Sequence, residues 1–211
     1  METPAKREWR LAEIILGMAM IVVLDLFAGL QIEYGAVFSA GVERTLSLAE
    51  DIGAAGFVVL VIAALIAGIR HEQRTVLKIF VVFLVFATIH LLANVFALVV
   101  TAHVRDDSYL WGVWDVGAAY LMIVAVFTGW YWVADELIAG GAFDFPVPAD
   151  REAEPPNLID YVFIAFNTNA TFGPTSETVV SRKVKVLMML QTVCSLVVLL
   201  VLVARIVGLG D

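Results

Sequence analysis

The chain has 211 residues, of which 61% are hydrophobic and 16% are charged, and its formal net charge is -8. A mean hydropathy of +0.91 makes it far more apolar than a soluble domain, which indicates a protein embedded in a lipid bilayer. The acidic balance argues against a nucleic-acid partner, because phosphate binding needs clustered Lys and Arg side chains. Cys194 is the only cysteine, so a disulfide within the chain and a thiolate metal site are excluded.

Five apolar stretches predict transmembrane helices. Each is close to the length of about 20 residues that crosses a bilayer core as a helix. The first stretch is too long for the apolar part of a cleaved signal peptide, and it contains Asp25. In chain order, the predicted spans are Leu11–Ile32, Gly53–Ile69, Ile79–Val104, Trp111–Ala134 and Val184–Leu209.

A sixth apolar segment, DYVFIAFNTNA, covers Asp160–Ala170 and is about half as long as a span. This length is typical of a re-entrant half-helix, which enters the membrane and returns to the same side. The predicted fold class is therefore all-α: a polytopic membrane protein with five transmembrane helices plus a re-entrant pore-loop half-helix between the last two. Two domains are expected, an N-terminal three-helix membrane bundle over residues 1–105 and a pore-like module over residues 106–211.

The positions of Lys and Arg predict the orientation in the membrane. Ten of the 13 basic residues precede the first span, lie between spans two and three, or lie between the end of span four and the second residue of span five. Loops rich in Lys and Arg stay in the cytoplasm, so we expect a cytoplasmic N-terminus and a C-terminus on the opposite side. The same rule puts the half-helix on the cytoplasmic side.

The half-helix runs into a polar hairpin, NTNATFGPTSET, over residues 167–178. The frame T-N-A-T-F-G-P-T-S within it resembles the T-x-x-T-x-G-Y-G-D element of potassium-channel pores, with Pro174 at the tyrosine and Thr175 at the second glycine. The resemblance implies a pore-loop cation channel, although potassium channels place this loop on the outer side of the membrane. The ion-pathway or filter residues that it implies are Thr168, Thr171, Phe172, Gly173, Pro174, Thr175 and Ser176.

The two replaced positions bear on ion selectivity. A potassium filter stacks rings of backbone carbonyls, which requires glycine-like dihedral angles at alternate residues. Thr175 is β-branched and disfavours positive φ, while Pro174 pushes Gly173 towards extended conformations. We therefore expect a wider, hydrated constriction lined by hydroxyl groups, which passes monovalent cations with little preference for potassium.

The C-terminal third also resembles a family of uncharacterised bacterial inner-membrane proteins with a domain of unknown function. The resemblance rests on GGAFDFP at residues 140–146 and on IDYVFIAFNTNATFGPTSETVVSRKVKVLMMLQTV at residues 159–193. It implies a multi-pass protein of the bacterial inner membrane. The resemblance also implies no known enzyme activity, and no cofactor is expected. The sequence contains no G-x-G-x-x-G, Walker, G-x-S-x-G, H-E-x-x-H or C-x-x-C motif.

One short hairpin per chain cannot enclose a pore, so the channel hypothesis requires a homo-oligomer, and a homotetramer is favoured. Acidic residues around the hairpin, such as Asp135 and Asp144, would then form a vestibule that concentrates cations. For the Pro-rich segment PVPADREAEPP over residues 146–156, a solvated connector is the alternative. For the polar residues of the last span, helix–helix contacts are the alternative to lining the pore. The candidate pore-lining or vestibule residues are Asp160, Glu177, Gln191, Thr192 and Ser195.

A second candidate site lies inside the membrane. Asp25 on the first span and Asn94 on the third are expected at similar heights, with His90 one turn below Asn94 on the same face. A carboxylate in lipid is costly, so it should face the bundle and find a partner. The cluster could relay protons or hold a cation in a proton-coupled carrier, or it could only fix packing in a non-conducting membrane scaffold. No metal site is expected, because His71, His90 and His103 lie at different depths.

Overall fold

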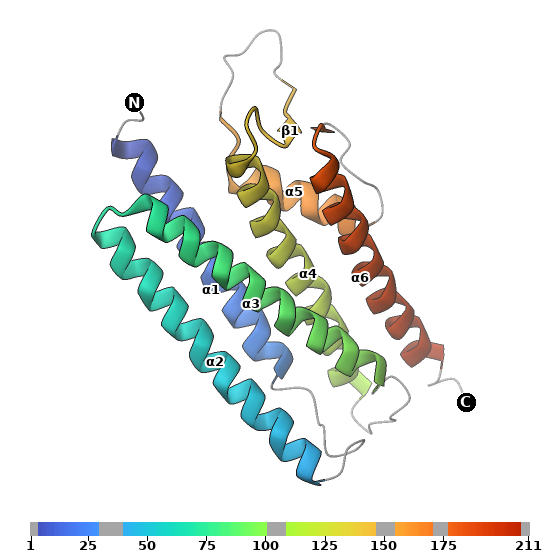
Figure 1. The fold of residues 1–211 in the computed structure, drawn as a ribbon. Helices are drawn as coiled ribbons and strands as arrows, with labels where there is room; N and C mark the ends of the chain where they lie inside the picture. The colour runs from blue at the N-terminus through green and yellow to red at the C-terminus, as the bar shows by residue number, and fades with distance from the viewer. Residues whose placement is uncertain (1–3, 30–39, 101–108, 147–154, 171–176, 208–211) are drawn as a thin grey trace. The chain divides into compact units, whose positions relative to one another are not determined.

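The computed structural model describes residues 4–29, 40–100, 109–146, 155–170 and 177–207. These residues are overwhelmingly helical, which confirms the predicted all-α class (Figure 1). The described residues also contain two strands of two residues each, which the sequence did not predict. The elements are α1 (Pro4–Gly29), α2 (Ala40–Ile69), α3 (Gln73–Val100), α4 (Tyr109–Leu137), β1 (Phe143–Asp144), α5 (Leu158–Asn169), β2 (Thr178–Val179) and α6 (Arg182–Val207).

Within the described ranges, four helices contain a stretch long and apolar enough to cross a membrane. They correspond to the second, third, fourth and fifth predicted spans. Large apolar side chains such as Leu16, Val59 and Leu200 are more than 60% exposed, which suits contact with lipid chains rather than with water. The four stretches are Ile52–Ile69, Gln73–Val100, Val116–Leu137 and Arg182–Val207.

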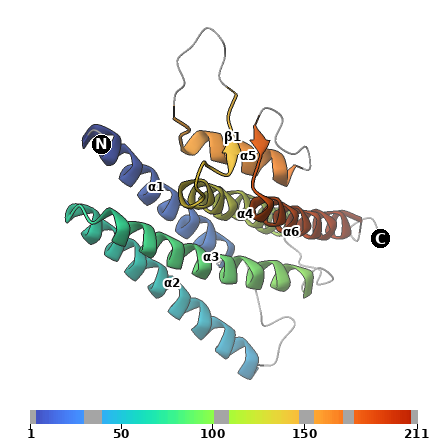
Figure 2. The ribbon, with the colours of Figure 1, turned by 45° about the horizontal axis from the view of Figure 1, so that its top comes forward.

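The chain forms two compact units. The first unit comprises residues 1–122 and 198–211, and the second unit comprises residues 123–197. In the first unit, α1, α2 and α3 run alongside one another in both views (Figures 1 and 2). Apolar side chains from all three helices are fully buried there, among them Met18, Phe57 and Phe83.

Glycines on α2 allow its neighbours to approach closely. A β-carbon at Gly68 would lie 2.6 Å from the side chain of Leu11 on α1, so no larger residue fits without displacement. Small residues at such contacts are typical of packing between membrane helices, where close backbone approach replaces the hydrophobic effect. The helix ends in a Schellman turn: His71 has a positive φ of 57°, and the Glu72 amide donates to the Ala67 carbonyl at 3.0 Å.

The second unit contains the end of α4, the strand pair, α5 and the beginning of α6. The strands β1 and β2 are antiparallel, with Phe143 opposite Val179 and Asp144 opposite Thr178. Helix α5 corresponds to the predicted half-helix and begins two residues earlier than expected. Its length is 12 residues, about 18 Å, so it is too short to cross a bilayer core.

A capping box begins α5. The side chain of Asn157 accepts a hydrogen bond from the Ile159 amide at 2.8 Å, and Asp160 accepts one from the Asn157 amide at 2.7 Å. Asp160, which the sequence suggested for a vestibule, thus uses one carboxylate oxygen to cap its own helix.

Candidate functional site

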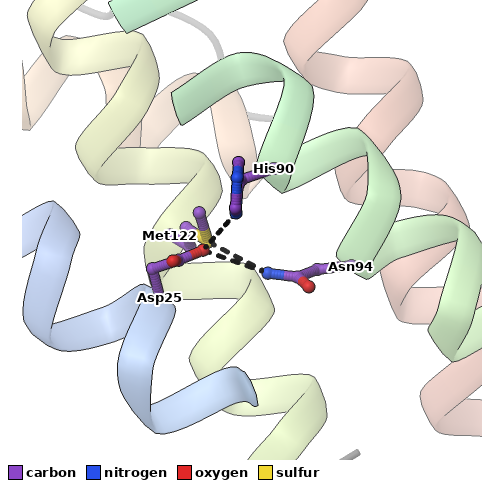
Figure 3. Close-up of polar contacts among 4 residues, drawn as sticks. All are labelled: Asp25, His90, Asn94 and Met122. Carbon is purple, nitrogen blue, oxygen red and sulfur yellow. Dashed lines mark hydrogen bonds and ion pairs between the residues drawn. The ribbon is translucent and has the colours of Figure 1, made fainter. Parts of the chain in front are cut away.

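The structure brings together the three polar residues that the sequence singled out inside the membrane (Figure 3). The Nδ1 atom of His90 lies 3.6 Å from Oδ1 of Asp25, and Nδ2 of Asn94 donates to the same oxygen at 3.4 Å. The Asn94 amide group also lies 3.7 Å from the sulfur of Met122 on α4. Asp25, Asn94 and Met122 are buried, and the side chain of His90 is 19% exposed.

Helix geometry explains why these groups meet. His90 and Asn94 are four residues apart on α3, so they share one face of the helix. That face turns towards α1, and both side chains reach the carboxylate of Asp25. Sequence reasoning did not include Met122, because a thioether in an apolar helix carries no pattern that distinguishes it from core packing.

The imidazole ring of His90 lies against Phe57 of α2 and against Phe86 of its own helix, α3. Its centroid lies 5.1 Å from that of Phe57 and 4.7 Å from that of Phe86. It also occupies the space beside Gly53, where a β-carbon would lie 2.5 Å from Nε2 of the ring and closer still to Cε1. Gly53 is therefore part of the site, although its sequence position indicated only the beginning of a span.

A carboxylate and an imidazole at this distance can share one proton without net charge. No three His, Cys, Asp or Glu side chains converge as metal ligands within the described ranges. The arrangement is chemically suited to holding a proton.

A second polar cluster joins α5 to its neighbours in the second unit. Gln191 of α6 accepts a hydrogen bond from the hydroxyl of Tyr131 and donates one to the Ala165 carbonyl at 2.7 Å. Ser195 donates to the Asn169 carbonyl at 3.0 Å and also to the Asn169 side chain. Both α6 side chains are completely buried in the chain. Gln191 and Ser195 thus form the helix contacts that the sequence left open as the alternative to pore lining.

The other sequence-predicted pore residues make local contacts or lie outside the described residues. Thr168 and Thr192 each donate to the carbonyl four residues earlier in their own helix. Glu177 is half-buried directly before β2. Thr171, Phe172, Gly173, Pro174, Thr175 and Ser176 lie outside the described residues.

Asp135, at the end of α4, has a role that the sequence did not indicate. Its Oδ1 accepts hydrogen bonds from the amides of Ala142 at 2.5 Å and Phe143 at 3.1 Å. Its Oδ2 accepts one from the hydroxyl of Tyr161 on α5 at 2.6 Å. Both carboxylate oxygens therefore accept hydrogen bonds from the protein itself. The expectation that Asp135 concentrates cations in a vestibule stays a prediction.

No protein-family model matches the chain, and no curated protein or solved structure is significantly similar to it. The resemblances to potassium-channel pores and to bacterial inner-membrane proteins therefore stay predictions.

Proposed function

We propose that the second unit is the pore-loop module of an oligomeric cation channel, and that the channel discriminates poorly between sodium and potassium. The protein would lie in the bacterial inner membrane with a cytoplasmic N-terminus. Helix α1, with 26 residues, would provide a fifth span. Four copies around a central axis would enclose the pore.

One observation carries this proposal. The end of α5 lies far along α6, whereas the two strands that flank α5 pair with each other next to the beginning of α6. Asn169, the last residue of α5, bonds Ser195, which lies 13 residues beyond the first residue of α6. That separation is about 20 Å along the helix axis. In contrast, β1 before α5 pairs with β2 after it, directly ahead of α6.

This geometry supports a re-entrant path. The eight residue steps from Ala170 to Thr178 can span at most about 29 Å, which is sufficient for a return over about 20 Å. Inside a bilayer, an irregular segment is tolerated only where it is buried in protein or lines a water-filled space. A symmetric oligomer with a hydrated axis provides both conditions.

The channel proposal is tested by reconstituting the protein in liposomes and measuring the reversal potential under opposed sodium and potassium gradients. We expect similar permeability for the two ions, because Pro174 and Thr175 prevent a complete carbonyl ladder. Strong potassium selectivity would contradict the role given to these two residues. Absence of any ion flux in a folded tetramer would contradict the channel.

A proton-coupled carrier is the second candidate, and the Asp25–His90–Asn94 cluster is the observation that favours it. A buried carboxylate 3.6 Å from an imidazole is an arrangement that proton-transferring membrane proteins use. The symmetry of the purified particles separates the two candidates. A tetramer favours the channel, whereas a monomer or dimer favours the carrier or a non-conducting scaffold.

A further inference from the structure

We propose that Asp135 is the positioning residue of the pore-loop module: it ties both ends of the segment containing α5 to the end of α4, and thereby fixes where α5 begins relative to α4. The inference rests on the function proposed above, in which α5 is the half-helix of a pore loop. It deepens that function by assigning the placement of the half-helix to one carboxylate.

The carboxylate makes three hydrogen bonds to the segment before α5 and to α5 itself. The amides of Ala142 and Phe143 donate to Oδ1, and the hydroxyl of Tyr161 donates to Oδ2. Tyr161 is the fourth residue of α5, so the last of these bonds holds the first turn of the helix. Hydrogen bonds to a carboxylate are stronger than those between neutral groups.

The turn between α4 and β1 is shaped for this contact. Gly140 and Gly141 have φ angles of +85° and +80°, a conformation that residues with a β-carbon rarely adopt. A β-carbon at Gly141 would in addition lie 3.1 Å from Oδ1 of Asp135. The two glycines thus allow the chain to fold back so that consecutive amides point at the carboxylate.

The far end of the segment is tied to the same place through Ala142. This residue is completely buried, and while its amide donates to Asp135, its carbonyl accepts from the amides of Val180 at 3.1 Å and Ser181 at 3.4 Å. Val180 and Ser181 connect β2 to α6. The carboxylate therefore anchors the chain directly where it leaves α4. Through Ala142 it also anchors, indirectly, the residues that lead into α6.

A second contact on the same face of α4 holds the other half of α5. Tyr131 lies four residues before Asp135, so both side chains project from one face of the helix. Asp135 bonds Tyr161 near the beginning of α5, and Tyr131 bonds Gln191, which in turn bonds the Ala165 carbonyl in the second half of α5. If the Asp135–Tyr161 bond is lost while the bonds through Tyr131 and Gln191 remain, only the beginning of α5 should become more mobile.

The test uses three variants of the full chain. Asp135→Asn removes one of the two acceptor oxygens at nearly constant size, and Tyr161→Phe removes a single hydroxyl group. Asp144→Asn is the matched control, since it removes the same charge from an exposed side chain of the neighbouring strand. Hydrogen–deuterium exchange is measured across α5, with α3 as the reference for global stability.

We expect amide exchange in the first turns of α5 to become about tenfold faster in Asp135→Asn, the factor that corresponds to one lost charge-assisted hydrogen bond. Tyr161→Phe should give a smaller acceleration, and Asp144→Asn none. Exchange in α3 should stay unchanged in all three variants. Unchanged exchange in α5 for Asp135→Asn and Tyr161→Phe would overturn the proposal; if Asp135→Asn does not fold, Tyr161→Phe decides alone.

The second measurement is the sodium-to-potassium permeability ratio in liposomes, which a contact that only stabilises the fold would leave unchanged. We expect the ratio to shift in Asp135→Asn and Tyr161→Phe. It should not shift in Asp144→Asn, because a vestibule charge attracts sodium and potassium alike and changes only the total flux. A loosened α5 with an unchanged ratio would overturn the positioning role. If the unmodified protein conducts no ions, the proposed channel fails, while the exchange data still decide whether Asp135 holds α5.

Discussion

The imidazole of His90 occupies the place that a side chain at Gly53 would take. A β-carbon built on Gly53 would lie 2.5 Å from Nε2 of the ring and closer still to Cε1, a separation that no pair of such atoms tolerates. The position of His90 beside Asp25 thus depends on the absence of a side chain on α2. Through this contact α2, which carries Gly53, packs against the site that Asp25 of α1 and His90 of α3 form.

Gly53→Ala is expected to displace His90 and weaken its contact with Asp25. Overpacking of this kind costs about 1–3 kcal/mol of unfolding free energy. The control is Gly17→Ala on α1, where no heavy atom lies within 4 Å of the added carbon and where the higher helix propensity of Ala should leave stability equal or slightly raised. Thermal unfolding in detergent measures both variants. Equal losses would contradict a specific role for the space beside Gly53.

Asp25→Asn separates packing from proton chemistry. If the carboxylate only connects α1 to α3, the variant should change stability by about 1–2 kcal/mol, typical of hydrogen bonds between membrane helices, and leave ion flux unchanged. The measurements are thermal unfolding and flux in liposomes with and without a proton gradient. Loss of proton-dependent flux in a folded Asp25→Asn protein would favour the carrier over the channel.

Gln191→Met should be clearly destabilising. It removes the acceptor for Tyr131 and the donor to the Ala165 carbonyl, and leaves both buried groups without these bonds. The expected loss is about 1–3 kcal/mol. The neighbouring Thr192→Val is the control, because its hydroxyl bonds to Met188 of its own helix and should matter little. Similar effects of the two substitutions on thermal unfolding would argue against Gln191 as the link between α5 and α6.

Reporter fusions test the orientation. A reporter fused after Asp211 should be periplasmic, and one inserted near Glu152 should be cytoplasmic, because basic residues concentrate before the first span and beside the half-helix. Localisation is read from a pair of enzymes that are active on opposite sides of the membrane. A cytoplasmic signal after Asp211 would reverse the expected topology and place the half-helix on the outer side, as in potassium channels.

The double substitution Pro174→Tyr with Thr175→Gly should move ion selectivity towards potassium. It restores the tyrosine and the second glycine of the potassium-channel element, and with them the dihedral freedom that a carbonyl ladder requires. The measurement is the reversal potential under opposed sodium and potassium gradients. An unchanged permeability ratio in a folded, conducting double variant would contradict the role of these positions in selectivity.

The sequence alone is sufficient to predict the helices, because a helix is formed by interactions between residues close together in the chain. Apolar stretches of about 20 residues predict membrane helices because each helix satisfies its own backbone hydrogen bonds. Because the rise per residue of a helix is fixed, the sequence positions of Asp25, His90 and Asn94 also predict that these residues lie at similar depths in the membrane. In the same way, the short apolar segment beginning at Asp160 predicts α5.

Which distant side chains meet depends on the tertiary fold. Asp135 and Tyr161 are 26 residues apart, and Tyr131 and Gln191 are 60 apart, so no local periodicity connects them. An acid at the end of a membrane helix has the same sequence signature whether it faces an aqueous vestibule or accepts bonds from backbone amides. Asp135 accepts them because the glycine turn brings two amides to its carboxylate, and that turn holds its shape through contacts with segments far along the chain.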